Sequence, residues 1–360
     1  MGEITYRGRR AFSIENEHLK ATLLVEGGHL AELRHKASGT NPLWTPPWPS
    51  IEPSRFDPAT HGNLYGGHAE SRLLAGIMGH NLCMDIFGGV SDAEAAAGLT
   101  PHGDGSIVPY SISDSGGVLT ARAEFPHARI GFERRIRLEG CAAIIEETAR
   151  NLTSIDKPTA WTQHVTLGPP FLEKGRTLFR VPATRSRVYE QDFGGEFGRY
   201  APGMDFDWPM VPLKQGGSLD LRVLPDAKAS SGFTTQLMDP RREQAFFLAW
   251  SPSSKVLAGY VWRRSDFPWL GIWEENFARE QPPWNSRTLT RGMEFGVSPM
   301  PEARRQMIER PMLFGVPGYR WLPAKGEATV TYCAFVTTAD AIPDEVAWSG
   351  GADLAFHPAR

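Results

Sequence analysis

The chain has 360 residues, of which 41% are hydrophobic and 22% are charged, and its formal net charge is −3. Such a composition is typical of a globular protein that can bury a sizeable core. The charge balance shows no basic excess of the kind that neutralises phosphate backbones, so we expect no nucleic-acid partner. A small neutral ligand suits this balance better.

The composition also limits where the protein works. Its first 20 residues are polar and charged, without the apolar core of a signal peptide, and no later stretch approaches the ~20 apolar residues of a membrane span. We therefore expect a cytoplasmic protein with no membrane partner. The 3 cysteines are far apart and form no CxxC motif, so neither a disulfide framework nor a metal or redox motif is predicted.

In chain order, the first half predicts antiparallel strands joined by tight turns. Apolar residues alternate with polar ones in several of these runs, as in a sheet with one buried face. Gly27 and Gly28 form the turn of the first hairpin, and residues 113–117 form that of the second. The predicted strands are 19–25, 29–33, 106–112, 118–125, 130–138 and 142–147.

The second half continues this pattern, and helices are scarce throughout. Pro, Gly, Asp and Ser clusters separate the apolar runs at intervals typical of sandwiches and barrels. Residues 41–58 and 191–217 carry Trp or Phe, so we expect ordered loops over a sheet. Further strands are predicted at 160–167, 244–250, 256–262, 293–297 and 328–336, and short helices at 69–78, 92–97 and 302–309. The sequence predicts a mainly β chain, and we interpret 1–360 as one domain.

Three side chains are candidates for acid–base chemistry. His102 lies in a turn beside Gly103, where it can approach a ligand or simply bond to its own loop. His164 lies in an apolar strand, as a titratable group near a sheet face or as a satisfied core histidine. Glu294 lies in an apolar strand where burial raises the pKa of a carboxyl from ~4.3, unless it pairs with Arg287 or Arg291.

The 10 histidines predict no metal site, because they form no H-x-x-x-H or H-x-H pair and their spacing is long.

The order of these features resembles the aldose 1-epimerase (galactose mutarotase) family over nearly the whole chain. Members have a glycine turn near the N-terminus, an arginine before a His-Gly pair, a strand histidine, and a late strand glutamate after Arg-x-x-x-Arg-Gly. The matching residues are Gly27-Gly28, Arg72, His102-Gly103, His164 and Glu294. The resemblance implies a large antiparallel β-sandwich, the galactose mutarotase-like supersandwich, in an enzyme that interconverts sugar anomers.

The resemblance also implies a role for each matching side chain. Glu294 is the base that removes the proton of the anomeric hydroxyl, and His164 is the acid that protonates the ring oxygen. His102 hydrogen-bonds the same oxygen, and Arg72 binds a ring hydroxyl. No metal or organic cofactor is implied, because the open-chain aldehyde of the sugar is itself the intermediate.

Two departures from the family pattern bear on the substrate. Residues 165–167 are Val-Thr-Leu where typical members have Tyr-Phe-Asn-Leu, and Glu294 is followed by Phe-Gly in place of Pro-Gln. We therefore do not assume galactose. For the aspartate that binds sugar hydroxyls in the family, Asp266 and Asp239 are the candidates.

Residues 261–276 form the densest aromatic and polar cluster in the chain. Trp rings stack on the C–H faces of sugars while polar side chains bond the hydroxyls, so the cluster predicts a substrate-binding wall. The alternative is a packed strand pair with a surface salt bridge. The nominated substrate-binding residues here are Asp266, Trp269, Trp273 and Asn276.

Other functions remain open at this point. A hexose-6-phosphate 1-epimerase would need a cationic pocket, for which 263–264 and 185–187 supply arginines. A non-catalytic carbohydrate-binding protein would use the same groove with an idle acid–base pair. A glycoside-cleaving enzyme would recruit Glu274, Glu275 or Asp266 as a second carboxylate. The sequence does not indicate an oligomeric state.

Overall fold

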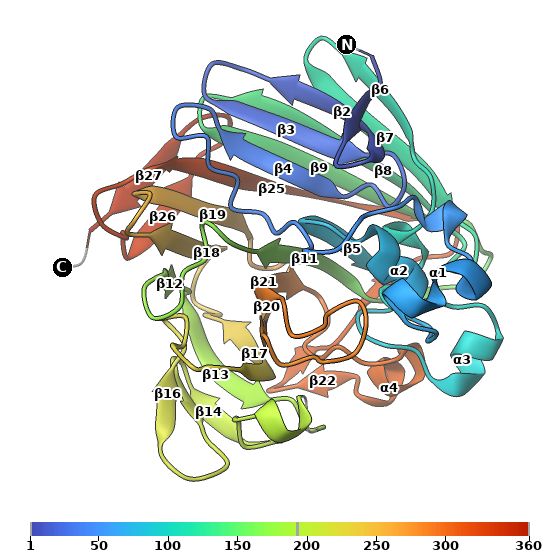
Figure 1. The fold of residues 1–360 in the computed structure, drawn as a ribbon. Coiled ribbons are helices and arrows are strands. Elements are labelled where there is room, and N and C mark those ends of the chain that lie inside the picture. The colour runs from blue at the N-terminus through green and yellow to red at the C-terminus, as the bar shows by residue number, and fades with distance from the viewer. Residues whose placement is uncertain (1, 192–193, 359–360) are drawn as a thin grey trace.

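Two large antiparallel sheets form most of the protein, which we describe from a computed structural model covering residues 2–191 and 194–358 (Figure 1). Within these residues, the first sheet has 11 strands in the order β1-β2-β3-β4-β5-β11-β21-β20-β17-β13-β14. The second has eight, in the order β12-β18-β19-β25-β9-β8-β7-β6. The mainly β, antiparallel sandwich predicted from the sequence is confirmed.

The strands of the first sheet are β1 (Ile4–Tyr6), β2 (Arg9–Glu15), β3 (Leu19–Leu24), β4 (Leu30–His35), β5 (His80–Met84), β11 (Trp161–Leu167), β13 (Ala183–Val188), β14 (Asp205–Asp207), β17 (Ser230–Met238), β20 (Trp269–Asn276) and β21 (Leu289–Gly296). Those of the second are β6 (Ser111–Ser115), β7 (Val118–Phe125), β8 (Ile130–Glu139), β9 (Ala142–Asn151), β12 (Leu178–Arg180), β18 (Gln244–Ser251), β19 (Val256–Arg263) and β25 (Glu327–Thr338).

Smaller elements surround the sheets. Four short ribbons pair β10 (Lys157–Thr159) with β24 (Arg320–Leu322), β15 (Met210–Pro212) with β16 (Ser218–Asp220), β22 (Met312–Leu313) with β23 (Val316–Pro317), and β26 (Glu345–Trp348) with β27 (Leu354–His357), counting the described residues. The helices α1 (Pro58–Tyr65), α2 (Ser71–Gly76), α3 (Asp92–Ala96) and α4 (Arg304–Glu309) gather at one side of the molecule (Figure 1). None of the helices in the described ranges combines the length and the apolar character that a bilayer crossing needs.

The main core lies between the two sheets. Side chains such as Leu33 from the first sheet and Ile136 from the second are buried in one continuous apolar cluster. A buried carboxylate links the two sheets across this core: Glu147 on β9 accepts hydrogen bonds from Trp161 and Gln163 on β11. Burying a polar group costs free energy unless it is hydrogen-bonded, so these bonds tie β11 to the opposite sheet.

Each predicted strand corresponds to a strand of the structure, but for most of them the first or last residue differs. The largest difference lies at 106–112, where β6 begins only at Ser111, because Ser106 belongs to a short helical turn and donates its hydroxyl to the Leu82 carbonyl at 2.6 Å. The second hairpin turns later than expected, at Gly116 and Gly117, both with positive φ. Much of the predicted loop 191–217 is ordered and includes β14 and β15; its residues 192–193 lie outside the described residues.

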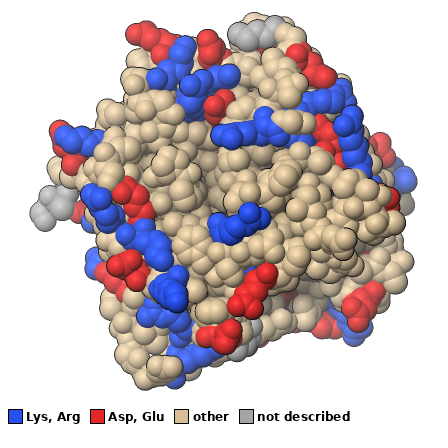
Figure 2. Space-filling view, in the orientation of Figure 1, with Lys and Arg blue, Asp and Glu red and all other residues tan. Residues whose placement is uncertain are grey.

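A second apolar cluster covers the outer face of the 11-stranded sheet. It joins Trp269, Trp273 and Phe233 on the sheet to Leu73 and Leu74 on α2. In Figure 2 the centre of the viewed face is mostly tan around a blue patch of Lys or Arg, and most other charged side chains lie toward the edges. Loops and short helices therefore enclose one part of the sheet, and the candidate site lies there.

Candidate active site

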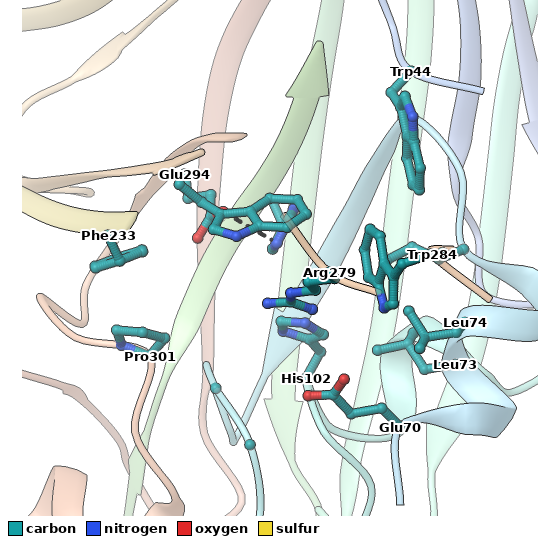
Figure 3. Close-up of a pocket in the computed structure, with 15 residues that line it drawn as sticks. Trp44, Glu70, Leu73, Leu74, His102, Phe233, Arg279, Trp284, Glu294 and Pro301 are labelled. Atoms are coloured by element: carbon teal, nitrogen blue, oxygen red, sulfur yellow. Dashed lines mark ion pairs between the residues drawn. The ribbon is translucent and has the colours of Figure 1, made fainter. Parts of the chain in front are cut away.

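A pocket opens on the outer face of the first sheet, within the second apolar cluster (Figure 3). It encloses about 700 Å³, including the part that is open to solvent. Its floor comes from neighbouring strands, and its sides come from α2 and from loops. The residues that line it include Trp44, Glu70, Leu73, Leu74, His102, His164, Phe233, Trp273, Arg279, Trp284 and Glu294.

His164 and Glu294 stand directly opposite each other on the antiparallel strands β11 and β21. Residues in such register have their side chains next to each other on one face of the sheet. The His164 Nε2 and Glu294 Oε1 atoms are 3.1 Å apart, and both side chains are buried. His164 Nδ1 meets the Thr166 hydroxyl at 3.1 Å, which fixes the plane of the ring.

Two glycines leave space for the Glu294 carboxylate. A Cβ at Gly292, the next residue on the same face of β21, would lie 2.3 Å from Glu294 Oε1. Gly271 on β20 faces Glu294 across the sheet, and a Cβ there would come within 2.6 Å of the Phe233 ring. Larger residues at these positions would fill the floor of the pocket, so both glycines keep it open.

Burial sets the protonation of the pair. It raises the pKa of Glu294 well above its ordinary value, and it lowers the pKa of His164 well below its own. Two isolated ions are costly in this environment, and so is a net charge. The neutral pair, with the proton on Glu294, is therefore the favoured form, and a proton transfer over the 3.1 Å between the two groups gives the form with the proton on His164.

His102 reaches the same pocket from the loop that follows α3. Its ring meets the His164 ring edge-on, with centroids 5.0 Å apart. Its Nδ1 lies 2.7 Å from the Phe87 carbonyl and 2.9 Å from the Cys83 thiol. The turn holds His102 at φ 63°, a left-handed conformation that the sequence context Pro-His-Gly permits.

Aromatic rings and one arginine line the side of the pocket. The guanidinium of Arg279 lies over the rings of Trp284 at 4.7 Å and Trp273 at 5.5 Å, measured to the ring centroids. Its Nε is 3.4 Å from a Glu275 carboxylate oxygen, which holds the cation against the rings. In Figure 3 Arg279 is seen above the His102 ring, with Trp284 to the right and Glu70 below.

The predicted acid–base residues converge, whereas the predicted substrate-binding residues largely do not. His102, His164, Glu294 and Trp273 all line the pocket. Arg72 is exposed on α2 and donates its Nε to the Pro53 carbonyl at 3.0 Å, outside the pocket. The alternative reading of Glu294, a salt bridge to Arg287 or Arg291, does not occur among the described residues, where Arg291 pairs with Glu274.

Four further nominated residues lie elsewhere. Trp269 shares the outer face of β20 with Trp273, but loops cover it, and its indole donates to the Pro317 carbonyl at 3.0 Å. Asn276 is buried and donates to the Ala227 carbonyl at 2.9 Å. Asp266 sits in the turn before β20, where it pairs with arginines, and Asp239 pairs with Arg241.

The residues nominated for the alternative functions also lie outside the pocket lining. Glu274 and Glu275 are buried on β20. The arginines expected to bind phosphate are engaged elsewhere: Arg263 pairs with Asp266, and Arg187 pairs with Asp205. The structure thus offers no support for a phosphate pocket built from these arginines.

Several residues of the pocket were not predicted from the sequence. Arg279, Glu70 and Trp284 lie in loops or at a helix start, where no periodicity marks the direction of a side chain. Arg279 lies three residues after the aromatic cluster at 261–276, and that cluster was the nearest segment in the sequence to be predicted as part of a binding site. Trp44 belongs to the loop 41–58, whose tryptophans did predict an ordered segment.

The arrangement provides one proton donor and one acceptor within reach of the same small ligand. It also provides flat aromatic surfaces and polar groups around them, a combination that suits sugars. Among residues 2–191 and 194–358, no group of three or more His, Cys, Asp or Glu side chains is arranged to hold a metal ion.

Comparisons with known proteins identify the architecture. No protein-family model and no curated protein matches the chain. Among solved structures, a Klebsiella pneumoniae protein named as a proposed aldose 1-epimerase matches with a TM-score of 0.65 and 14% identity, over 92% of this chain and 80% of the other. A galactose mutarotase-like protein from Lactobacillus casei matches with a TM-score of 0.57 and 16% identity, over 91% and 100%.

The chain has the galactose mutarotase-like fold. A third structure, a galactose mutarotase-like protein from Clostridium acetobutylicum, agrees, with a TM-score of 0.59 and 12% identity over 94% of this chain and 98% of the other. At such identities the likeness concerns the fold, because one fold can carry several functions. On the galactose mutarotase-like fold, function has to be argued from the residues of the pocket.

Proposed function

We propose that the protein is a carbohydrate epimerase that interconverts the anomers of a sugar. The observation that carries this proposal is the cross-strand pair of His164 and Glu294, 3.1 Å apart on the floor of a pocket lined with tryptophans. The names of its structural neighbours support the same chemistry.

The reaction needs one group that accepts a proton while another donates one. The anomeric carbon of a cyclic sugar bears both the hydroxyl and the ring oxygen, so adjacent groups can reach both atoms. With the shared proton on His164, Glu294 accepts the proton of the anomeric hydroxyl and His164 donates to the ring oxygen. The bond from C1 to the ring oxygen breaks, and an open-chain aldehyde forms.

Ring closure reverses these transfers. The aldehyde group rotates about the bond to its neighbouring carbon, and the ring oxygen attacks its other face. Glu294 then returns a proton to the new anomeric hydroxyl, and His164 recovers its own from the attacking oxygen. Each cycle restores the original protonation of the pair, so atoms and charges balance without a cofactor.

Binding would use the sides of the pocket. We propose that Trp273 and Trp284 contact the C–H groups of the sugar beside Arg279, and that the Arg279 guanidinium donates to its hydroxyls. Glu70 supplies an acceptor on the same side. This assigns to Arg279 the hydroxyl-binding role that the sequence resemblance gave to Arg72.

The test is mutarotation of freshly dissolved sugars, followed by optical rotation or by NMR exchange between anomers. The protein should accelerate the reaction of at least one member of a panel of free and phosphorylated aldoses. Glu294→Gln should lower kcat roughly 10²- to 10⁴-fold, the usual contribution of a positioned acid or base, while sugar binding stays measurable by calorimetry.

Glu146→Gln provides the matched control, because Glu146 is an exposed carboxylate on β9 and should leave kcat unchanged. Sugar binding without any acceleration would overturn the proposal in favour of a non-catalytic carbohydrate-binding protein. Release of a reducing sugar from a glycoside would overturn it in favour of a cleaving enzyme.

A further inference from the structure

We infer that His102 acts as a hydrogen-bond acceptor that holds one particular hydroxyl of the sugar through its Nε2 atom, and does not bind the ring oxygen. This assignment rests on the proposed function for the identity of the ligand. The acceptor role of Nε2 follows from the hydrogen bonds that the imidazole ring makes within the protein.

Nδ1 of His102 lies against a backbone carbonyl. This atom is 2.7 Å from the Phe87 carbonyl oxygen, which can only accept a hydrogen bond. The nitrogen must therefore carry a hydrogen and donate it. In a neutral imidazole only one nitrogen is protonated, so Nε2 is left with a lone pair.

The backbone of His102 holds the ring in place. The His102 amide donates to the Gly88 carbonyl at 3.0 Å, and the His102 carbonyl accepts from the Met84 amide at 3.1 Å. A Cβ at Gly103 would lie 2.0 Å from the Met84 carbonyl oxygen, so the turn is packed tightly against the end of β5. With its main chain held on both sides, His102 keeps Nδ1 directed at Phe87.

The surroundings of the ring set its charge. The groups around the ring are Cys83, His164, Glu70 and Arg279. Burial lowers the pKa of His102, with Glu70 opposing this and Arg279 reinforcing it, and burial keeps the Cys83 thiol protonated by raising its pKa. The neutral ring is the favoured form, and its tautomer is the one with hydrogen on Nδ1.

The tautomer decides which ligand atom His102 can hold. A ring oxygen has no hydrogen, so it offers nothing to a nitrogen that can only accept. A hydroxyl has one to donate. His102 is thus a specificity-determining residue that selects for a hydroxyl, while proton transfer at the ring oxygen is left to His164.

NMR of protein labelled with ¹⁵N in its histidines tests the tautomer directly. The signals of His102 are assigned by their disappearance in His102→Asn. At neutral pH the expected pattern is a protonated Nδ1 and an unprotonated Nε2, and only Nε2 should shift when sugar is added. A charged ring, or a hydrogen on Nε2, would overturn the inference. This measurement does not depend on turnover, so it separates failure of this assignment from failure of the proposed function.

Kinetics test the consequence, with the aldose that the mutarotation panel identifies. His102→Asn keeps an amide near the Phe87 carbonyl but removes the acceptor, and it should raise KM roughly 10- to 100-fold with kcat nearly unchanged. With the wild type, one monodeoxy analogue should have a kcat/KM that is lower than that of the parent sugar by a similar factor. With His102→Asn, the same analogue and the parent sugar should have equal kcat/KM.

A large fall in kcat at unchanged KM would instead identify His102 as a proton donor in the reaction. Equal losses for each deoxy analogue in wild type and variant would also contradict the inference. Thermal unfolding of His102→Asn, compared with that of the wild type, checks that the turn still folds.

Discussion

Arg279 is a cation held in place by its surroundings. Its guanidinium lies over the faces of Trp273 and Trp284, and its Nε faces Glu275. An arginine that is fixed in this way loses little conformational entropy when it binds a ligand. Preorganised donors contribute to affinity mainly by lowering the cost of ordering.

A pair of substitutions tests this role of Arg279. Arg279→Ala should raise the KM for the sugar roughly 10- to 100-fold, since a charge-assisted hydrogen bond is lost. Arg72→Ala serves as the control, because Arg72 bonds the Pro53 carbonyl outside the pocket and should leave KM and kcat unchanged. Steady-state mutarotation kinetics measure both. The opposite outcome would return the hydroxyl-binding role to Arg72.

The two arginines also show how far the sequence could lead at the scale of single residues. The pairing of His164 with Glu294 could be anticipated, because both occupy predicted strands and the family order placed them in one site. Arg72 fitted the same order, yet its side chain lies on the exposed side of a short helix. Nothing in the sequence indicates which side of a two-turn helix faces a pocket, or where a loop arginine such as Arg279 folds back.

At the scale of elements, β11 connects the pocket with the core. Its side chains alternate, so that Gln163 points toward Glu147 between the sheets while His164 points into the pocket. Glu147 also accepts from Arg134 at 2.7 Å and from Tyr332 at 2.8 Å, both on the second sheet. β11, which carries His164, is therefore held in place by hydrogen bonds on its core-facing side.

Removing this carboxylate should be costly. Glu147→Ala leaves the cation of Arg134 buried without its partner, and it should lower the free energy of unfolding by about 3–5 kcal/mol. The neighbouring Glu146→Ala, on the exposed face of β9, should change it by less than about 1 kcal/mol. Urea unfolding compares the two variants. Equal effects would mean that the buried Glu147 carboxylate does not stabilise the contact between the sheets.

Some elements were not visible in the sequence for a related reason. β5 and β17 are buried along their whole length, but they carry His80, Asn81, Thr234 and Gln236 among their residues. Strands with polar side chains on both faces show no alternation of apolar and polar residues. Their burial depends on partners from other strands, which a local pattern does not contain. β8, with one apolar and one charged face, was predicted almost to its ends.

At the scale of the whole molecule, buried histidines link stability to pH. Burial lowers the pKa of His80 to about 3, and that of His29 to about 3 as well. An unfolded chain takes up these protons near pH 6.5. Between these values the unfolded state binds more protons than the folded state, so stability is fully present above about pH 6.5 and falls as the pH is lowered toward 3.

The slope of this dependence is measurable. Each histidine should contribute about 1.4 kcal/mol per pH unit within the window. His80→Asn should reduce the slope of unfolding free energy against pH by about one proton, whatever its effect on stability at neutral pH. An unchanged slope in the His80 variant would show that this histidine does not titrate on unfolding.

The position of the pair on strands, with walls supplied by loops and a short helix, has a consequence for how such proteins diversify. The register between β11 and β21 sets the position of His164 relative to Glu294, and a loop insertion does not change that register. The segments that carry Glu70, Arg279 and Trp284 can change in length or sequence while that register persists. For the activity proposed above, a change of sugar preference would therefore require changes in these surface segments only, with the His164–Glu294 pair kept.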